Sequence, residues 1–136
     1  MRVFIDTNIP MYAAGKDHPL KKNCLDILES TAKGEIEAFT DTEVLQEILY
    51  RSFYINQRKT GFEVFDLFAI IMDGSILPVR YGDIILARLL AEKEETFKLS
   101  PRDLIHLAVM LNNGIRHIVT ADLGFAGFPE IEVIKP

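Results

Sequence analysis

Hydrophobic positions along the chain alternate between short runs typical of buried strands and longer segments with the spacing of amphipathic helices. Strands are expected at 2–6, 36–40, 76–79, 116–121 and 131–134, the last of them at a sheet edge. Helices are expected at about 7–14, 19–33, 41–59, 61–73, 82–97 and 101–113. Strands that alternate with helices in this way favour an α/β fold with a parallel sheet.

Local signals mark several of the expected helix boundaries. Thr40–Glu43 matches a capping box at the start of the third helix. Ser100–Asp103 combines a cap serine, a proline at the first helical position and an acid two residues later. Asn113 and Gly114 tolerate the left-handed backbone that commonly ends a helix. Gly61 is expected to separate the third helix from the fourth.

Length and composition indicate one globular domain over residues 1–136. Of these residues, 49% are hydrophobic and 26% charged, and no repeat, low-complexity tract or linker divides them. No apolar run approaches the roughly 20 residues of a membrane helix. The first residues resemble a strand and not a signal peptide. We therefore expect a protein of the cytoplasm with no membrane association.

The net charge of −5 argues against a protein that coats nucleic acid, because such a protein needs a basic surface. The negative net charge does not exclude a nuclease, since a pocket of acids contributes several negative charges and is filled with cations during catalysis. The single cysteine, Cys24, cannot form an internal disulfide, and its spacing to other ligand types indicates no zinc site.

Two acids stand where expected strands end. Asp6 closes the first apolar run and Asp122 follows the fourth. Ligands of open parallel sheets bind beyond the carboxyl ends of the strands, so both acids are candidates for a site there. Each could equally be a helix cap or a turn residue, because aspartate favours both positions.

Two further acids lie in expected helices. Glu47 borders an apolar stripe and precedes Arg51 by four residues, which is also the spacing of a weak surface ion pair. Asp103 occupies the third helical position, where a carboxylate can hydrogen-bond back to the cap and meet the helix dipole. A capping role and a metal-binding role are compatible, since a carboxylate has two oxygens.

Four segments together resemble the PIN-domain nucleases. Phe4–Asn8 resembles the opening Asp-Thr-Asn of that family, and Val44–Glu47 its helical glutamate. Pro101–Ala108 is similar to its Asp-led helix, and Thr120–Phe125 to its Thr-x-Asp-x-x-Phe segment. The segments follow in the family's order and spacing over the whole chain, and the chain's length suits the stand-alone, toxin-like branch called VapC.

The resemblance implies a PIN domain, with a parallel sheet of about five strands sandwiched by helices. It also implies an endoribonuclease that depends on one or two Mg²⁺ or Mn²⁺ ions. The acidic quartet carried over from the family consists of Asp6, Glu47, Asp103 and Asp122, with Asn8 and Thr120 as supporting polar groups. Carboxylates suit such hard ions, which lower the pKa of bound water and neutralise a phosphoryl group.

Within that quartet, Asp6 and Asp103 are expected to bind the principal ion and Asp122 to complete the site. Glu47 would orient water or help to hold a second ion, and the hydroxyl of Thr120 would position Asp122 or a phosphate. Charges held so close repel one another when the site is empty. Asp6→Asn should therefore abolish cleavage without destabilising the metal-free fold.

The expected partners follow from the same resemblance. They are an RNA substrate, a small antitoxin protein whose tail binds near the site, and a second copy in a homodimer. Arg102, beside Asp103, is the best candidate for contact with RNA phosphates. Aromatic residues between 50 and 68 are expected to pack the third and fourth helices, or alternatively to form an exposed groove or dimer surface. His106 is expected to be a half-buried histidine with a satisfied hydrogen bond.

Three other functions compete with this interpretation. A haloacid-dehalogenase-like phosphatase also begins with a strand that ends in Asp, but it needs a second Asp where Asn8 stands. A non-catalytic RNA- or protein-binding module would have no reason to keep four acids. A housekeeping RNA-processing nuclease of the same fold stays open. The absence of G-x-S-x-G, P-loop and G-x-G-x-x-G motifs argues against serine hydrolases, NTPases and dinucleotide enzymes.

Overall fold

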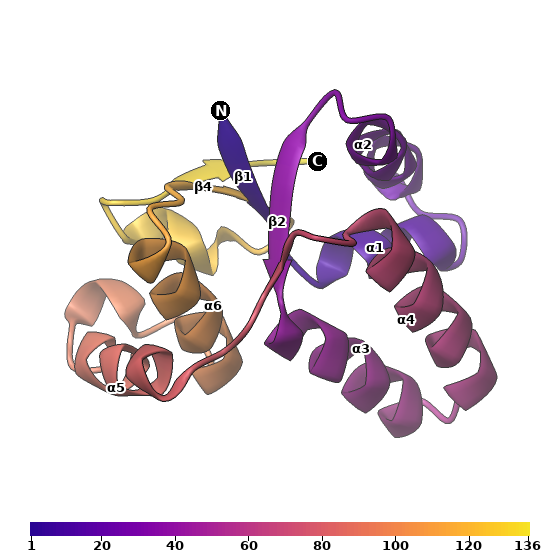
Figure 1. Cartoon of the computed structure of the whole chain (residues 1–136). Coiled ribbons are helices and arrows are strands. Elements are labelled where there is room, and N and C mark those ends of the chain that lie inside the picture. Colours follow the sequence, from indigo (N-terminus) through magenta and orange to yellow (C-terminus); the bar gives the residue numbers. More distant parts are fainter.

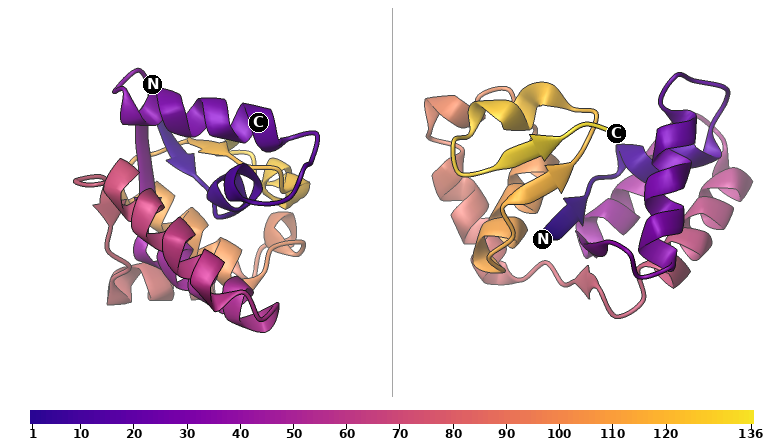
Figure 2. Two further views of the ribbon diagram at one scale, coloured as in Figure 1. Left: turned by 90° about the vertical axis from the view of Figure 1, so that its right-hand side faces the viewer. Right: turned by 90° about the horizontal axis from the view of Figure 1, so that it is seen from above.

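A computed structural model, which describes all residues from 1 to 136, has a parallel five-stranded sheet with strand order β3-β2-β1-β4-β5 (Figures 1 and 2). The strands are β1 (Arg2–Ile5), β2 (Glu37–Asp41), β3 (Ile76–Leu77), β4 (His117–Val119) and β5 (Glu132–Ile134). All four neighbouring pairs run parallel. The α/β fold expected from the hydrophobic pattern is confirmed, and β5 lies at an edge.

The helices pack in pairs: α1 with α2, α3 with α4, and α5 with α6. Their bounds are α1 (Asn8–Ala14), α2 (Lys21–Ala32), α3 (Thr42–Tyr54), α4 (Arg58–Ile71), α5 (Tyr81–Leu90) and α6 (Pro101–Asn112), with short 3-10 turns η1 (Glu94–Thr96) and η2 (Leu123–Gly127). In Figure 1, α1 to α4 lie to one side of the sheet's middle strands and α5 and α6 to the other. No helix is both long enough and apolar enough to cross a membrane.

The central strand β1 is the structural reason that distant residues meet. Its residues Val3, Phe4 and Ile5 are buried, and Phe4 pairs in register with Phe39 of β2 and Ile118 of β4. The amide of Asp6 then donates to the carbonyl of Val119 at 3.2 Å. The ends of β1 and β4 are thus adjacent, although more than 110 residues separate them in the chain.

The turn between α3 and α4 differs from the sequence expectation. It lies at residues 55–57, where Asn56 adopts a left-handed backbone with φ of 58°, and Gly61 lies inside α4. A Cβ on residue 61 would collide with the side chain of Ser52 on α3. Gly61 is therefore a point of close helix contact and not a helix break.

Two helix boundaries also differ in detail. The cap of α3 is Asp41, whose side chain accepts from the amide of Val44 at 2.9 Å, while Thr40 belongs to β2. The fifth helix ends at Leu90 instead of continuing to residue 97. Ser100 caps α6 as expected, through the reciprocal hydrogen bonds of a capping box with Asp103.

Candidate metal centre

A small polar cavity of about 200 Å³ opens where β1 and β4 end and where α3 and α6 approach the sheet. Its walls contain all four acids of the expected quartet. The lining residues are Asp6, Asn8, Tyr12, Glu47, Arg51, Asp103, Ala121 and Asp122. The acids come from four separate segments, so only the folded chain can bring them to one cavity.

Asp6 is held by a dense set of hydrogen-bond donors. Its Oδ1 accepts from the amide of Thr7 at 2.8 Å, and its Oδ2 accepts from the hydroxyl of Thr120 at 2.7 Å and from Asn8 Nδ2 at 3.2 Å. The same hydroxyl accepts from the amide of Asp122 at 3.0 Å. Thr120 therefore bridges two members of the quartet, while Asn8 contacts both Asp6 and Thr120.

Glu47 is a buried carboxylate on α3 whose two oxygens have different partners. Its Oε1 accepts from the hydroxyl of Thr7 at 2.8 Å, and its Oε2 accepts from Arg51 at 2.9 Å and 2.7 Å. The ion pair with Arg51 that competed with a site role is thus present. It does not remove Glu47 from the cavity, because both residues line it.

Asp103 and Asp122 each give an oxygen to local backbone. Asp103 Oδ2 accepts from the amide of Ser100 at 3.0 Å, and Asp122 Oδ1 accepts from the amide of Gly124 at 2.8 Å. Each residue therefore caps a helical turn and also faces the cavity. In both residues a local capping contact thus coexists with a position at the cavity.

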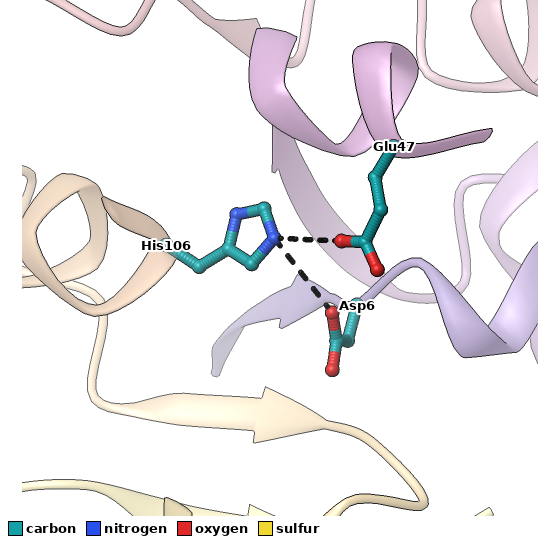
Figure 3. A group of neighbouring side chains, drawn as sticks. All are labelled: Asp6, Glu47 and His106. Carbon is teal, nitrogen blue, oxygen red and sulfur yellow. Dashed lines mark hydrogen bonds and ion pairs between the residues drawn. The ribbon is translucent and has the colours of Figure 1, made fainter. Parts of the chain in front are cut away.

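His106 lies deeper than expected. It is fully buried, and its Nδ1 lies 2.8 Å from Asp41 Oδ2, while Nε2 lies 3.4 Å from Glu47 Oε1 and 4.0 Å from Asp6 Oδ1 (Figure 3). Asp6, Glu47 and His106 form the tightest group of candidate ligands, with one ligand atom of each within 4.8 Å of the others. Asp103 and Asp122 lie outside this group but in the same cavity.

Burial and mutual repulsion work against ionisation of two of the acids. Burial raises the pKa of Asp6, with a smaller contribution from the charge of Asp103, against the opposing effect of His106. Burial also raises the pKa of Asp103, and the charge of Asp122 adds to it. These shifts are expected where carboxylates are held together without a cation.

The pKa of Glu47 moves the other way. Its burial would raise the pKa, but hydrogen bonds with His106 and Thr7 and the charge of Arg51 outweigh that effect and lower it to about 2. Burial alone would lower the pKa of His106, whereas the carboxylates of Asp41, Glu47 and Asp6 raise it well above its ordinary value. In the metal-free protein, positive charge from His106 and Arg51 thus balances part of the acidic cluster.

The donor set fits a divalent metal ion. Carboxylate oxygens are common ligands of Mg²⁺ and Mn²⁺ in proteins, and an imidazole nitrogen joins them at sites of first-row transition ions. Asp6, Glu47 and His106 converge closely enough to share one ion, and Asp103 and Asp122 border the same space. The acidic cluster could therefore bind a divalent metal.

Arg102, the expected RNA contact, does not line the cavity. Its guanidinium lies 3.9 Å from the ring centroid of Tyr50 and 3.9 Å from the carboxylate of Glu43. The side chain remains about one-third exposed. Arg51 on α3 is the basic residue that the structure brings to the acids themselves.

Sequence reasoning missed four contributors to this region. The sequence places Asp41 only in a capping pattern, indicates no individual role for Thr7 or Tyr12, and predicts a half-buried His106, which is in fact fully buried. One signal was available for His106, because residues three apart share a helix face and His106 follows Asp103 by three. No sequence signal connects His106 with Asp41, since 65 residues separate them.

This parallel α/β fold has four acids around one cavity, two of them just past β1 and β4 and two on α3 and α6. A family model described as the PIN domain matches residues 3–131. The chain belongs to the PIN-domain family, and the resemblance inferred from its four segments is confirmed.

Individual relatives fall in the VapC group. Ribonuclease VapC13 of Mycobacterium tuberculosis is 37% identical over 130 residues, which cover 96% of this chain and 97% of the relative. Ribonuclease VapC23 of the same species is 32% identical over 120 residues, covering 88% and 92%.

Solved structures share the fold at lower identity. VapBC2 from Rickettsia felis, bound to a DNA fragment of the promoter, has a TM-score of 0.74 at 20% identity and covers 99% of this chain and 98% of that one. Mycobacterium tuberculosis VapC20, a Sarcin-Ricin loop cleaving toxin, has a TM-score of 0.71 at 17% identity and covers 91% and 92%.

Proposed function

We propose that this protein is a metal-dependent endoribonuclease and the toxin of a VapBC-type toxin–antitoxin pair. The observation that carries the proposal is the single cavity that all four acids of the quartet line. The relatives named as VapC ribonucleases, at up to 37% identity over nearly the whole chain, support the same activity and substrate class.

The quartet is proposed to hold one or two divalent ions, Mg²⁺ or Mn²⁺. Asp6 and Asp103 would bind the principal ion, Asp122 would complete the site, and Glu47 would orient water or help to hold a second ion. Such ions supply charge neutralisation around the phosphoryl group and make water more acidic. Thr120 keeps Asp6 and Asp122 in fixed relation through its two hydrogen bonds.

Two arginines are proposed to hold the RNA backbone. Arg51 is half exposed at the cavity and already binds a carboxylate oxygen, so its guanidinium can also meet a phosphate oxygen there. Arg102 lies in the first turn of α6, with its guanidinium over the ring of Tyr50. An arginine held in that way can contact a phosphate farther along the strand.

A small antitoxin and a second copy of the chain are the proposed protein partners. An apolar groove of about 500 Å³ between α1, α2 and α4 exposes Leu25 and Leu67, which supports binding of a partner helix. On α5, Tyr81, Ile84 and Leu89 are exposed, which supports a homodimer contact. Several of the solved structures with this fold are themselves toxin–antitoxin complexes.

Cleavage of single-stranded RNA in Mn²⁺ tests the catalytic assignment. Asp103→Asn should lower the rate by at least about a hundredfold, because it removes a negative ligand while the amide oxygen can still accept the capping hydrogen bond from Ser100. The matched control is Asp66→Asn, which changes an exposed acid on α4 and should cleave like the wild type. Equal cleavage by Asp103→Asn and wild type would show that the quartet is not catalytic.

The toxin role is tested separately from the chemistry. A small reading frame overlapping the upstream end of the gene, whose product suppresses cleavage by the purified protein, is expected for a toxin. If the purified protein cleaves RNA but the gene has no such upstream reading frame, the housekeeping RNA-processing nuclease of the same fold is favoured.

A further inference from the structure

His106 is the one residue beside the acidic cluster that can offer a nitrogen atom as a metal ligand. It lies on α6, three residues after Asp103, and its side chain is fully buried. Figure 3 shows its imidazole directed at the two carboxylates, with Nε2 at 3.4 Å from Glu47 Oε1 and 4.0 Å from Asp6 Oδ1.

Asp41 determines which ring nitrogen carries a hydrogen. Its Oδ1 accepts from the amide of Val44 at 2.9 Å, and its Oδ2 lies 2.8 Å from His106 Nδ1. An ionised carboxylate can only accept hydrogen bonds, so Nδ1 must be the donor. The lone pair of a neutral His106 ring is then on Nε2, the atom that faces the cluster. A metal ion that binds there displaces the Nε2 proton of the charged ring, which leaves as a proton to solvent.

A carboxylate that fixes the tautomer of an imidazole is the usual outer partner of a metal-ligating histidine. Two ligand atoms that each lie about 2.1 Å from one ion are separated by about 3 to 4 Å. The distances from Nε2 to Glu47 and Asp6 lie in that range. Nε2 therefore already lies at the spacing of a shared ion from both carboxylates, and the three ligand atoms lie within 4.8 Å of one another.

We propose that His106 Nε2 is a direct ligand of the divalent ion, held in place by Asp41, and that the site therefore prefers Mn²⁺, Co²⁺, Ni²⁺ or Zn²⁺ over Mg²⁺. The inference rests on the metal site of the proposed function and names an added ligand and the class of ion. Imidazole nitrogen favours first-row transition ions, whereas Mg²⁺ favours oxygen ligands with retained water.

The competing role for His106 is that of a structural ion pair. In that case Nε2 carries a hydrogen, donates it to Glu47, and never contacts a metal ion. The two roles differ in one observable, which is the presence of a nitrogen atom bonded to the ion.

Pulsed electron paramagnetic resonance of the Mn²⁺-loaded full-length protein measures that observable. Wild type should show a histidine nitrogen coupling, and selective ¹⁵N-labelling of histidine should convert it to the ¹⁵N pattern. His117→Asn is the matched control, since His117 pairs with Glu132 on neighbouring strands, and it should keep the signal. His106→Asn keeps a side-chain amide in place of the Nδ1 donor but has no Nε2, and it should lose the signal.

Asp41→Asn provides a second variant that disturbs the core less. Asparagine can still cap α3, but its amide group cannot both accept from Val44 and accept from Nδ1 in the same way. The nitrogen coupling should weaken, and the ratio of Mn²⁺ to Mg²⁺ affinity measured by titration calorimetry should fall at least tenfold in both variants.

The outcomes separate this inference from the proposed function. If Mn²⁺ binds wild type without nitrogen coupling, while Asp103→Asn still abolishes cleavage, the ligand assignment is wrong and the ribonuclease function stands. An unchanged Mn²⁺ to Mg²⁺ ratio in His106→Asn and Asp41→Asn would also overturn it. Failure of wild type to bind either ion would overturn both.

Discussion

Single residues of this cavity make local structural contacts and also line the candidate site. Glu47 forms the i, i+4 ion pair with Arg51 that a helix surface would allow, yet it also accepts from Thr7 and lines the cavity. Asp103 is both a capping-box member and a wall of the cavity. The local ion pair or cap can be predicted from neighbouring residues in the sequence. The position at the cavity depends on residues that only the folded chain brings near.

The pH dependence of stability should report on Glu47. Its pKa is lowered from 4.5 to about 2 in the folded protein, so it stabilises the fold in full above about pH 4.5, and this contribution is lost as the pH falls through 2. The contribution is on the order of 3 kcal/mol. In metal-free urea unfolding, Glu47→Gln should therefore be less stable at pH 6 and should lose less stability than wild type between pH 5 and 2.

Glu63→Gln, an exposed change on α4, is the control for that experiment and should follow the wild-type curve. If Glu47→Gln and wild type lost the same amount of stability between pH 5 and 2, Glu47 would not be a stabilised carboxylate.

In the helix pair α3 and α4, the sequence pattern predicts the helices but not the contact between them. Apolar residues with helical spacing predict two helices, at 41–59 and 61–73. Both helices exist, but α3 already ends at Tyr54 and α4 begins at Arg58. Gly61 was assigned to the break between them, since glycine commonly ends helices. Its observed position inside α4 follows from the contact with Ser52, which no local pattern contains.

Gly61→Ala should destabilise this pair of helices. The added Cβ would collide with Ser52 Cβ and Oγ, a buried side chain whose hydroxyl donates to the carbonyl of Ile48 at 2.7 Å. Overpacking of this kind costs about 1 to 3 kcal/mol, which exceeds the gain of up to about 1 kcal/mol from replacing a helical glycine.

The matched control is Gly82→Ala on α5, where a Cβ meets nothing within 4 Å. Thermal melting should show a lowered melting temperature for Gly61→Ala and an equal or higher one for Gly82→Ala. Two variants with the same melting temperature would mean that α3 and α4 separate to accommodate the methyl group.

For the whole molecule, assembling the acids has an energetic consequence. Burial of Asp6 and repulsion among Asp6, Asp103 and Asp122 oppose ionisation in the metal-free state. An ion that binds only the native state reverses this cost and stabilises the fold. Metal affinity and fold stability should therefore be linked through the same side chains.

Wild type in Mn²⁺ at about a hundred times its dissociation constant should gain about 2.7 kcal/mol. For a chain of this size, the gain raises the melting temperature by roughly 8 to 12 °C. Asp6→Asn should show almost no rise with Mn²⁺. Without metal it should melt close to the wild-type temperature, because relief of the repulsion offsets the loss of one hydrogen-bond acceptor for Thr7, Asn8 or Thr120. A loss of several degrees in the metal-free variant would count against a repulsive cluster.

The sequence by itself determined the order of strands and helices, the parallel α/β class and the four acids, because hydrophobic spacing, caps and motif order are local properties. Only the tertiary structure decided that Glu47 and Asp6 share their space with His106, and that Asp41, 65 residues earlier, orients its ring. The reason is physical. Asp41 ends β2 and His106 lies on α6, and the packing of these two elements in the fold buries the hydrogen bond between them.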